Sequence, residues 1–534
     1  MFKFSVKFII PVLVILLAFS ACAGGGGAGG GATTAAPATT AAAGDTTAAT
    51  TAATTAATTA AATTAAATKA AETTKAAAQP AAGAEPTVIS WLVMGSFAED
   101  HDMVFEELNK RIADRINVKL DLQYIGWGEF EDKIKLMSTA GDPFDLEYTS
   151  NWLNSFMDNI ARSALLPIDG LLAEHGKELY ASVPAWLFDA ARAGDVLYGV
   201  PNYQMVGDFY GVYIQKEYAD KYGLDAASIK NFEELEPFFK SIADNEPELI
   251  PLVKYQDPKI WPTYEAFLEG NLYMKKDDAT LTMISEWVAK EEEWRYRNHL
   301  YKQGFVRKDI VTNIDDSSDQ SANRYVATLN IAKPGGEAEY NASKGKEYIQ
   351  IPVSECYIAY DSGVSTITAI SATSKNPVDA MRFLNLIYTD KELYNMLLFG
   401  LEGVHYTKVG ENRVELAEKT KYFYGSSAWA FGNQFLAWYM PGQEDGTWEK
   451  TQELLDNARV SLIRGFYFDP STVQSELAQL SAVRTEYRNQ EFVTTDFDKW
   501  LKEYSDKLKA AGAEKLRDEF QRQLDEWAKS VGKK

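Results

Sequence analysis

Hydrophobic and polar positions follow two different periods in the first part of the aromatic-rich region. Residues 88–94 form a short apolar run, and residues 108–116 then carry apolar side chains at helical spacing. Residues 118–124 alternate at period two, residues 130–137 repeat the helical spacing, and residues 144–148 form a third apolar run. This order predicts β-α-β-α-β, which favours an α/β fold with a parallel sheet and helices on its faces.

Ligands of parallel sheets bind beyond the carboxyl ends of the strands. The three predicted strands end at the segments 95–97, 126–128 and 149–152, so these segments are expected to face a ligand. The candidate ligand-binding residues in and beside them are Ser96, Phe97, Trp127, Glu129, Asn151 and Trp152.

Two of these segments place a tryptophan beside glycines or a Ser-Asn pair, where a core residue is not expected. A pyranose ring has an apolar C–H face that stacks on indole, and its hydroxyls need Asn, Gln, Asp or Glu partners. The pattern therefore favours a sugar site, and packing roles for Trp127 and Trp152 are the alternative. Asn202 and Tyr203 are further candidates, because Pro201 keeps Val200 extended and predicts a strand end there.

The first 22 residues have the features of a targeting segment. Lys3 and Lys7 precede an apolar run over 8–19, which is 12 residues long and shorter than the roughly 20 that cross a bilayer. The run ends in FSAC, which resembles the lipobox of bacterial lipoproteins. That resemblance implies lipidation of Cys22, with cleavage after Ala21 and a free thiol as the alternative. Cys356 is then expected to be a buried, unpaired residue.

Residues 23–86 are predicted to be a disordered tether. They contain 29 Ala, 17 Thr and 9 Gly among 64 residues and lack aromatic and branched aliphatic side chains, so they cannot form a core. The working part of the chain is therefore expected over residues 87–534.

Charge and composition exclude several classes of protein. The chain carries 53 basic and 75 acidic residues, a net charge of −22, which argues against nucleic-acid binding. Its four histidines are spread singly, so no metal site, cofactor or nucleophile–histidine pair is predicted.

Several fragments resemble the extracellular solute-binding lipoproteins of sugar-importing ABC transporters. They are AGDPFDLEYTSNW (Ala140–Trp152), LLPIDGLL (Leu165–Leu172), DVLYGVP (Asp195–Pro201), YGVYIQKEYADKYGL (Tyr210–Leu224) and ISATSKNPVDAMRFLNLIYTD (Ile370–Asp390). The resemblance implies a two-lobed, type II periplasmic-binding-protein-like α/β fold with a hinge and a helical C-terminal extension. It also implies a monomer that captures a carbohydrate and delivers it to ABC permease subunits.

The family pattern assigns residues to two lobes. The first comprises 87–208 and 362–405, and the second comprises 209–361 and 406–534. Crossing strands are expected near 208–212 and 360–364.

The tail carries a narrower resemblance. Residues 396–409, 429–438 and 465–483 are similar to a subfamily of large lipoproteins whose C-terminal region, here 465–534, has no known function. Trp429, Asn433 and Gln434 are the cleft candidates expected from the second lobe, with a packing motif as the alternative. Helical spacing of Leu516, Phe520, Leu524 and Trp527 predicts a core-facing stripe.

A glycoside hydrolase, a peptide-binding protein and a surface sensor are the functions that the sequence leaves open beside sugar capture. A hydrolase would need two carboxylates about 5–10 Å apart, and a spatial pair of this kind cannot be recognised in a sequence. The whole-length resemblance favours a binding protein, and no catalytic residue is assigned.

Overall fold

The computed structural model describes residues 85–533, except 254–257, 259, 269 and 313–316. The predicted signal peptide over 1–22, its Cys22 and almost all of the predicted tether over 23–86 lie outside the described residues. The described residues belong to one compact unit of the chain.

The N-terminal region forms a five-stranded sheet with the strand order β2-β1-β3-β15-β6. Its strands are β1 (Thr87–Met94), β2 (Val118–Ile125), β3 (Leu146–Thr149), β6 (Gly199–Pro201) and β15 (Ile367–Ile370). β1 is parallel to β2 and β3, whereas β15 is antiparallel to both of its neighbours. The predicted β-α-β-α-β order is therefore confirmed, with β15 returning to the sheet from far along the chain.

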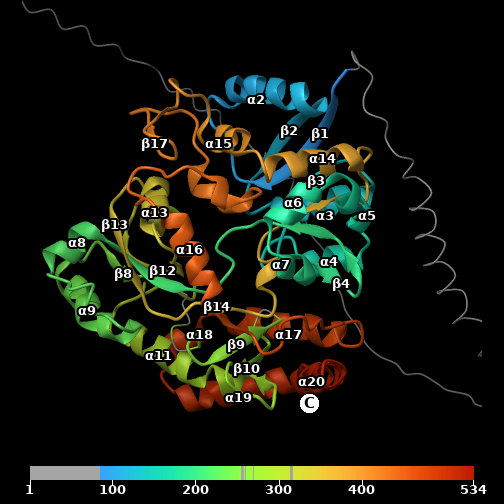
Figure 1. Ribbon diagram of the computed structural model, residues 1–534. Helices are drawn as coiled ribbons and strands as arrows, with labels where there is room; N and C mark the ends of the chain where they lie inside the picture. Colours follow the sequence, from blue (N-terminus) through green and yellow to red (C-terminus); the bar gives the residue numbers. More distant parts are fainter. Residues whose placement is uncertain (1–84, 254–257, 259, 269, 313–316, 534) are drawn as a thin grey trace, which may run out of the picture. The chain divides into compact units, whose positions relative to one another are not determined.

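Helices cover this first sheet with apolar stripes. Leu108 and Ile112 on α2 and Ile134 on α3 are buried, as their helical spacing predicts. Trp91 of β1 is fully buried, and its ring meets Phe383 and Phe431 edge to face. The helices of this region are α2 (His101–Ile116), α3 (Phe130–Ala140), α4 (Phe156–Ala161), α5 (Asp169–His175), α6 (Lys177–Ser182), α7 (Ala185–Ala190), α14 (Pro377–Ile387) and α15 (Lys391–Phe399). Figure 1 shows α2, α14 and α15 beside β1 and β2.

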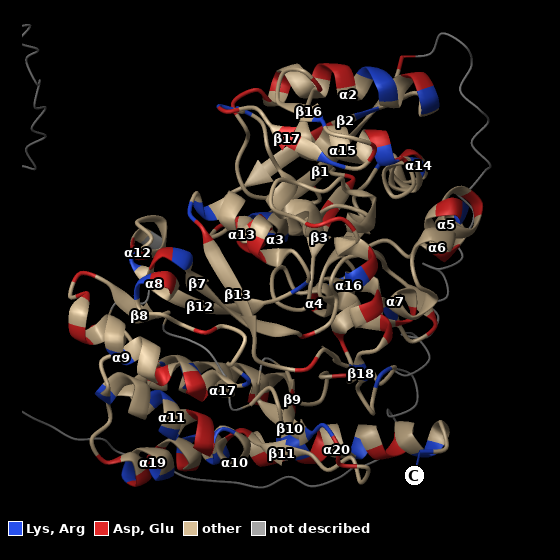
Figure 2. Ribbon diagram, turned by 60° about the vertical axis from the view of Figure 1, so that its left-hand side comes forward, with Lys and Arg blue, Asp and Glu red and all other residues tan. Residues whose placement is uncertain are grey.

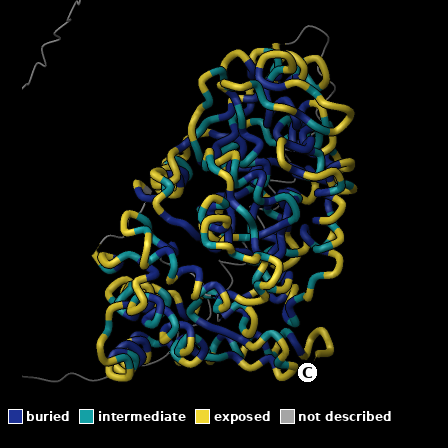
Figure 3. Tube along the Cα trace, turned by 90° about the vertical axis from the view of Figure 1, so that its left-hand side faces the viewer, coloured by how far each residue is buried: buried dark blue, intermediate teal, exposed yellow. Residues whose placement is uncertain are grey.

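A second sheet has the order β13-β7-β12-β8 and its own apolar core. Its strands are β7 (Tyr210–Gln215), β8 (Ile250–Leu252), β12 (Tyr325–Ile331) and β13 (Tyr348–Pro352). The associated helices are α8 (Lys216–Lys221), α9 (Glu236–Asn245), α11 (Glu291–Lys302), α12 (Ser317–Ser321) and α13 (Gly336–Lys344). Figure 3 shows buried positions running through the interior of the chain trace, with exposed positions concentrated on its outside.

The C-terminal helices build a third apolar cluster together with a small antiparallel sheet. Leu516, Phe520 and Leu524 of α20 are fully buried, which confirms the predicted stripe. α17 begins at Gln474; its Leu480 is buried in this cluster, and Leu477 packs against it. The elements of this region are β9 (Tyr264–Phe267), β10 (Leu272–Lys275), β11 (Ile284–Ser285), α10 (Glu286–Ala289), α17 (Gln474–Tyr487), α18 (Gln490–Val493), α19 (Phe497–Ala510) and α20 (Ala513–Ser530). Figure 2 shows acidic and basic residues near one another along the ribbons of α2 and α19.

Three segments cross between the two sheets and lie next to one another. Asp208 pairs with Tyr357 in an antiparallel bridge, and β14 (Tyr357–Ile358) pairs in parallel with β18 (Arg459–Val460). The sequence predicted crossings near 208–212 and 360–364 and missed the third one, at 459–460. The chain therefore returns to the first sheet before it crosses again into the C-terminal helices.

Residues after 405 depart from the predicted lobe boundary. Side chains between Tyr406 and Leu455 pack in the same apolar cluster as the first sheet, not with the second sheet. The cause is the long segment after α15, which folds back through β16 (Tyr406–Lys408), β17 (Val414–Leu416) and α16 (Thr447–Asp456) before the third crossing.

Candidate functional site: a cavity between the two sheets

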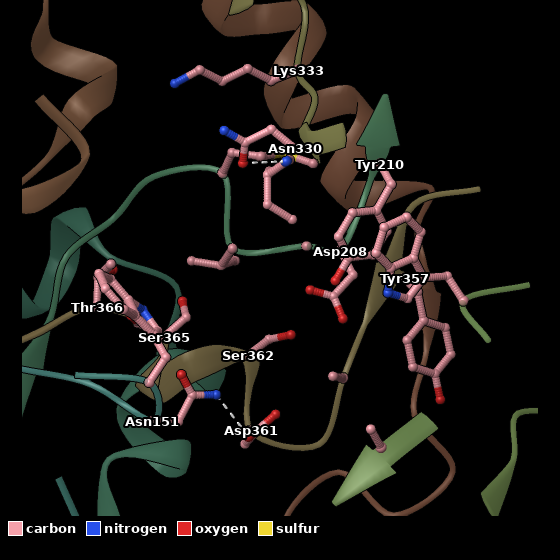
Figure 4. A pocket seen from close by; sticks show the side chains of 18 of the residues that line it. Asn151, Asp208, Tyr210, Asn330, Lys333, Tyr357, Asp361, Ser362, Ser365 and Thr366 are labelled. Atoms are coloured by element: carbon pink, nitrogen blue, oxygen red, sulfur yellow. Dashed lines mark hydrogen bonds between the residues drawn. The ribbon is translucent and has the colours of Figure 1, made fainter. Parts of the chain in front are cut away.

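A cavity of about 1020 Å³ lies where the crossing segments meet the two sheets. Its lining comes from the first sheet, the second sheet, β9 and β10, and the crossing segments. Figure 4 shows Asn151, Asp361, Ser365 and Thr366 on one side of this space and Asp208, Tyr210, Asn330 and Lys333 on the other.

Tryptophans form the wall on the side of the first sheet. The Trp152 ring is 52% exposed, and its Nε1 donates a hydrogen bond of 2.8 Å to the Ser365 carbonyl. The ring of Trp429 lies 6.0 Å from that of Trp152, centroid to centroid. Because its one donor is already satisfied, Trp152 is fixed in orientation while its apolar surface stays open to the cavity.

An aromatic pair forms the wall on the side of the second sheet. The ring of Tyr210, the first residue of β7, stacks on Trp261 with centroids 3.5 Å apart and an interplanar angle of 6°. Both residues line the cavity. The cavity therefore has aromatic surfaces on two opposite walls, which is an arrangement suited to holding flat, partly apolar rings between them.

Carboxylates from the crossing segments and from β9 form the polar floor. Asn151 Nδ2 donates a 2.7 Å hydrogen bond to Asp361, which places an amide and a carboxylate together. Burial and the neighbouring charge of Asp361 together raise the pKa of Asp208 to about 7, against the opposing effect of Lys276. Burial likewise raises the pKa of Glu265 to about 7, against the hydrogen bonds that it accepts. Near neutral pH these carboxyl groups can both accept and donate hydrogen bonds, as hydroxyl-rich ligands require.

A buried polar network supports the cavity behind Lys333. Its Nζ lies 2.8 Å from Glu339 and donates to Gln434 at 3.3 Å. Glu339 also accepts hydrogen bonds from Gln434 and Gln443. Lys333 and Glu339 belong to the region of the second sheet. Gln434 and Gln443 belong to the segment 406–455, which packs against the first sheet. This network therefore joins the two regions.

A second hollow of about 320 Å³ lies beside the cavity. Ser96, Phe97, Trp127 and Ser427 line it, and Trp429 lines both spaces. The ring of Trp127 lies 6.3 Å from Trp152 and 6.4 Å from Trp429. The three tryptophans therefore stand together at the boundary between the two spaces.

The predicted site residues are thus divided among several places. Asn151, Trp152 and Trp429 line the cavity, and Ser96, Phe97 and Trp127 line the hollow. Glu129 is the exposed residue before α3 and lines neither space.

Four other predicted residues have packing roles instead. Asn202 is fully buried, and its polar atoms are satisfied there. Its amide donates a hydrogen bond to the Ala430 carbonyl and accepts hydrogen bonds from the hydroxyls of Thr368 and Tyr388. Its neighbour Tyr203 packs on Phe435, with ring centroids 4.4 Å apart.

The remaining two lie next to this contact. Asn433 accepts a hydrogen bond from the Phe435 amide at the start of a 3₁₀ turn, and Gln434 lies in the network behind Lys333. The predicted placement of Asn202, Tyr203, Asn433 and Gln434 on the cleft surface is therefore corrected. Trp429, which was expected from the second lobe, packs against the first-sheet cluster.

Sequence reasoning missed the residues that the crossings and the second sheet contribute. These are Asp208, Tyr210, Trp261, Lys276, Lys333, Tyr357 and Asp361. The polar-aromatic run at Asp208–Tyr210, directly before a buried strand, is the one local signal that could have marked a strand end. The others are spread over residues 261–361 in several separate elements, so no single motif joins them.

The site offers hydrogen bonding and stacking rather than metal binding. Within residues 85–533, leaving out the undescribed gaps, no group of three or more His, Cys, Asp or Glu side chains could hold a metal ion. Cys356 is buried, as predicted, and burial raises the pKa of its thiol to about 12. Among the same residues no helix has the length and apolar character needed to cross a membrane.

The greater part of the chain matches a known protein family. Residues 95–393 match the bacterial extracellular solute-binding protein family, and residues 462–529 match a domain of unknown function. The chain is 26% identical over 466 residues to a carbohydrate ABC transporter substrate-binding protein of Streptococcus pneumoniae, covering 84% of this chain and 93% of that protein.

Solved structures show the same fold. The N-glycan transport solute-binding protein from Streptococcus pneumoniae has a TM-score of 0.74 and 25% identity, over 83% of this chain and 99% of that one. Complexes of the same protein with Man1GlcNAc and Man5GlcNAc have TM-scores of 0.73 and 0.71, at the same identity and covering 83% of this chain and 100% and 99% of those chains.

Proposed function

This chain belongs to the bacterial extracellular solute-binding protein family, and we propose that it captures an oligosaccharide in the cavity between its two sheets and delivers it to an ABC permease. The observation that carries the proposal is the pair of facing aromatic walls, Trp152 with Trp429 and Tyr210 with Trp261, above a floor of carboxylates and amides. The family, the pneumococcal carbohydrate-binding relative and the glycan-bound neighbours support it.

Ligand binding at this site would change the distance between the first-sheet and second-sheet regions. A ligand that contacts both walls binds more tightly when they are close together, so it stabilises the closed form. The permease then distinguishes the loaded form from the empty one. The two lobes proposed here are the first-sheet and second-sheet regions joined by the crossings.

The protein is further proposed to act as a monomer held at the outer face of the cell membrane by a lipid on Cys22, after removal of residues 1–21. The apolar run before FSAC and the Ala/Thr/Gly-rich segment that follows support this placement. A tether of 64 residues gives the folded part a reach of roughly 40–50 Å from the lipid.

The test is binding of purified protein to an array of oligosaccharides and short peptides, followed by calorimetric titration of each positive compound. Trp152→Ala is expected to weaken glycan binding 10- to 100-fold, on the order of 1.5–3 kcal/mol, since it removes a stacking surface. Tyr180→Ala is the matched control, because Tyr180 is also a half-exposed aromatic residue but packs on Phe188.

Binding of peptides but of no oligosaccharide would favour a peptide-binding protein and contradict the proposal. Release of a shortened glycan during the titration would instead indicate a hydrolase. A Trp152→Ala loss no greater than that of Tyr180→Ala would show that binding occurs elsewhere.

A further inference from the structure

The hollow beside the cavity is lined by residues that a folded core would normally cover. Phe97 is 55% exposed and Trp127 is 51% exposed, although each belongs to a loop that follows a buried strand. Two large exposed aromatic side chains that line the same depression mark a binding surface more often than a scattered surface residue does.

The hollow lies at the carboxyl ends of β1 and β2, whereas the cavity begins at the carboxyl end of β3. Ser96 and Phe97 follow β1, Trp127 follows β2, and Asn151 and Trp152 follow β3. Because all three strands are parallel, both spaces open on the ligand-binding edge of one sheet. The hollow is therefore a continuation of the edge on which the cavity lies.

The floor of the hollow is held in place by contacts between distant segments. The Ala98 amide donates a 2.7 Å hydrogen bond to the Tyr424 hydroxyl, and the Tyr424 ring stacks on Tyr124 with centroids 5.1 Å apart. The Phe97 ring meets Tyr124 edge to face at 5.2 Å. These contacts order the hollow before a ligand arrives, which lowers the entropic cost of binding there.

Trp429 connects the two spaces. It lines both of them, and its neighbours Ser426 and Ser427 line the cavity and the hollow respectively. A chain of sugar rings that leaves the cavity over Trp429 meets Trp127 and then Phe97, with serine hydroxyls beside the aromatic faces. This alternation of ring faces and small hydrogen-bonding groups fits pyranose chemistry.

We propose that the hollow is a second ligand subsite, which receives one arm of the same oligosaccharide whose remainder occupies the cavity. The inference rests on the proposed function and specifies its substrate class as an extended or branched glycan that passes over Trp429. A monosaccharide or disaccharide held in the cavity leaves the hollow without a sugar.

The experiment measures the affinities of short and long glycans for the wild-type protein and for variants of the hollow. The probes are Man1GlcNAc with Man5GlcNAc, and maltose with maltopentaose, titrated calorimetrically. Phe97→Ala removes one aromatic face, and Ser427→Trp fills the space with a side chain. Tyr180→Ala is the control, since it removes an exposed aromatic residue that lines neither space.

In at least one pair the wild-type protein is expected to bind the long glycan at least tenfold more tightly than the short one. Both variants are expected to weaken binding of the long glycan more than tenfold and that of the short glycan less than threefold. Equal losses for both lengths, or equal wild-type affinities within each pair, would overturn the subsite while leaving the cavity as a sugar site. If the wild-type protein binds none of the four glycans, the subsite is overturned, and so is a ligand of the mannose or the maltose class.

Discussion

A buried glutamate in the first sheet is expected to make the protein less stable as the pH rises. Glu147 lies in β3 and is fully buried. Asn154 donates a 2.8 Å hydrogen bond to its Oε2, whereas Oε1 has no hydrogen-bond partner among the described residues. Burial raises the pKa of Glu147 from 4.5 to about 7, against the hydrogen bond from Asn154 and the charge of Arg162. Between pH 4.5 and about 7 the folded state therefore binds more protons than the unfolded state.

The sign and size of the effect follow from proton linkage. Where the folded state binds more protons, the free energy of unfolding falls with increasing pH. A pKa shift from 4.5 to about 7 corresponds to a contribution of roughly 3 kcal/mol to the free energy of unfolding. This contribution is present in full below pH 4.5 and is lost as the pH rises to 7 and above. Glu147→Gln keeps the shape and stays neutral, so it should match the wild type near pH 4.5. At pH 8 it should be more stable than the wild type by up to about 3 kcal/mol.

The assay is urea unfolding followed by fluorescence at half-unit steps from pH 4.5 to 8.5. Other buried carboxyls, Glu265 and Asp208 among them, give both proteins a common slope, so the difference between the two curves isolates Glu147. Exposed Glu106→Gln serves as the control and should run parallel to the wild type. Parallel curves for Glu147→Gln as well would show that Glu147 is already ionised in the folded protein and would refute the reasoning.

Three further predictions concern binding and stability. Asp208→Asn should weaken glycan binding about 10- to 100-fold in calorimetric titration, because it removes a carboxylate from the cavity floor; an unchanged affinity would exclude this carboxylate from the ligand contacts. Arg297→Ala should lower the free energy of unfolding by about 3–5 kcal/mol in urea, because it leaves Glu491, 2.8 Å away, and Glu293 buried without this cation; a loss below 1 kcal/mol would contradict that account. Phe520→Ala should cost about 3–5 kcal/mol in the same assay, since Phe520 is fully buried between Phe267, Phe466 and Phe468; a small loss would mean that the C-terminal helices contribute little to global stability.

Local periodicity predicted β1, β2, β3, α2 and α3 well because each of them has a clear apolar pattern. The stripe on α20 was readable for the same reason, since its buried residues recur on one helical face. α17 begins at Gln474, later than the Asp-Pro-Ser sequence at 469–471 would suggest. Its apolar spacing was still informative, because Val473 and Leu480 are buried in the C-terminal cluster and Leu477 packs against it.

The site was predictable where it follows a strand of the first sheet and at Trp429. Trp127, Trp152 and Trp429 were recognised because glycine, serine and asparagine surround them in the sequence. Asn202 and Gln434 have the same polar character, yet the fold uses them to satisfy buried groups. A sequence does not distinguish an amide that bonds the backbone from one that awaits a ligand, because both need the same residue type.

Part of the cavity floor lies on the crossing segments, which would link ligand contact to movement of the two regions. Asp208 lies on the first crossing, and Tyr357 lies on the second. Glu265 accepts hydrogen bonds from the Tyr357 hydroxyl and from Ser461, which follows the third crossing, each at 2.8 Å. One carboxylate therefore ties the second and third crossings together beside the cavity, while Asp208 lines the cavity from the first crossing. A ligand bound at this floor contacts the segments whose rotation would set the separation of the walls, so its affinity must differ between the open and closed forms unless those contacts stay unchanged.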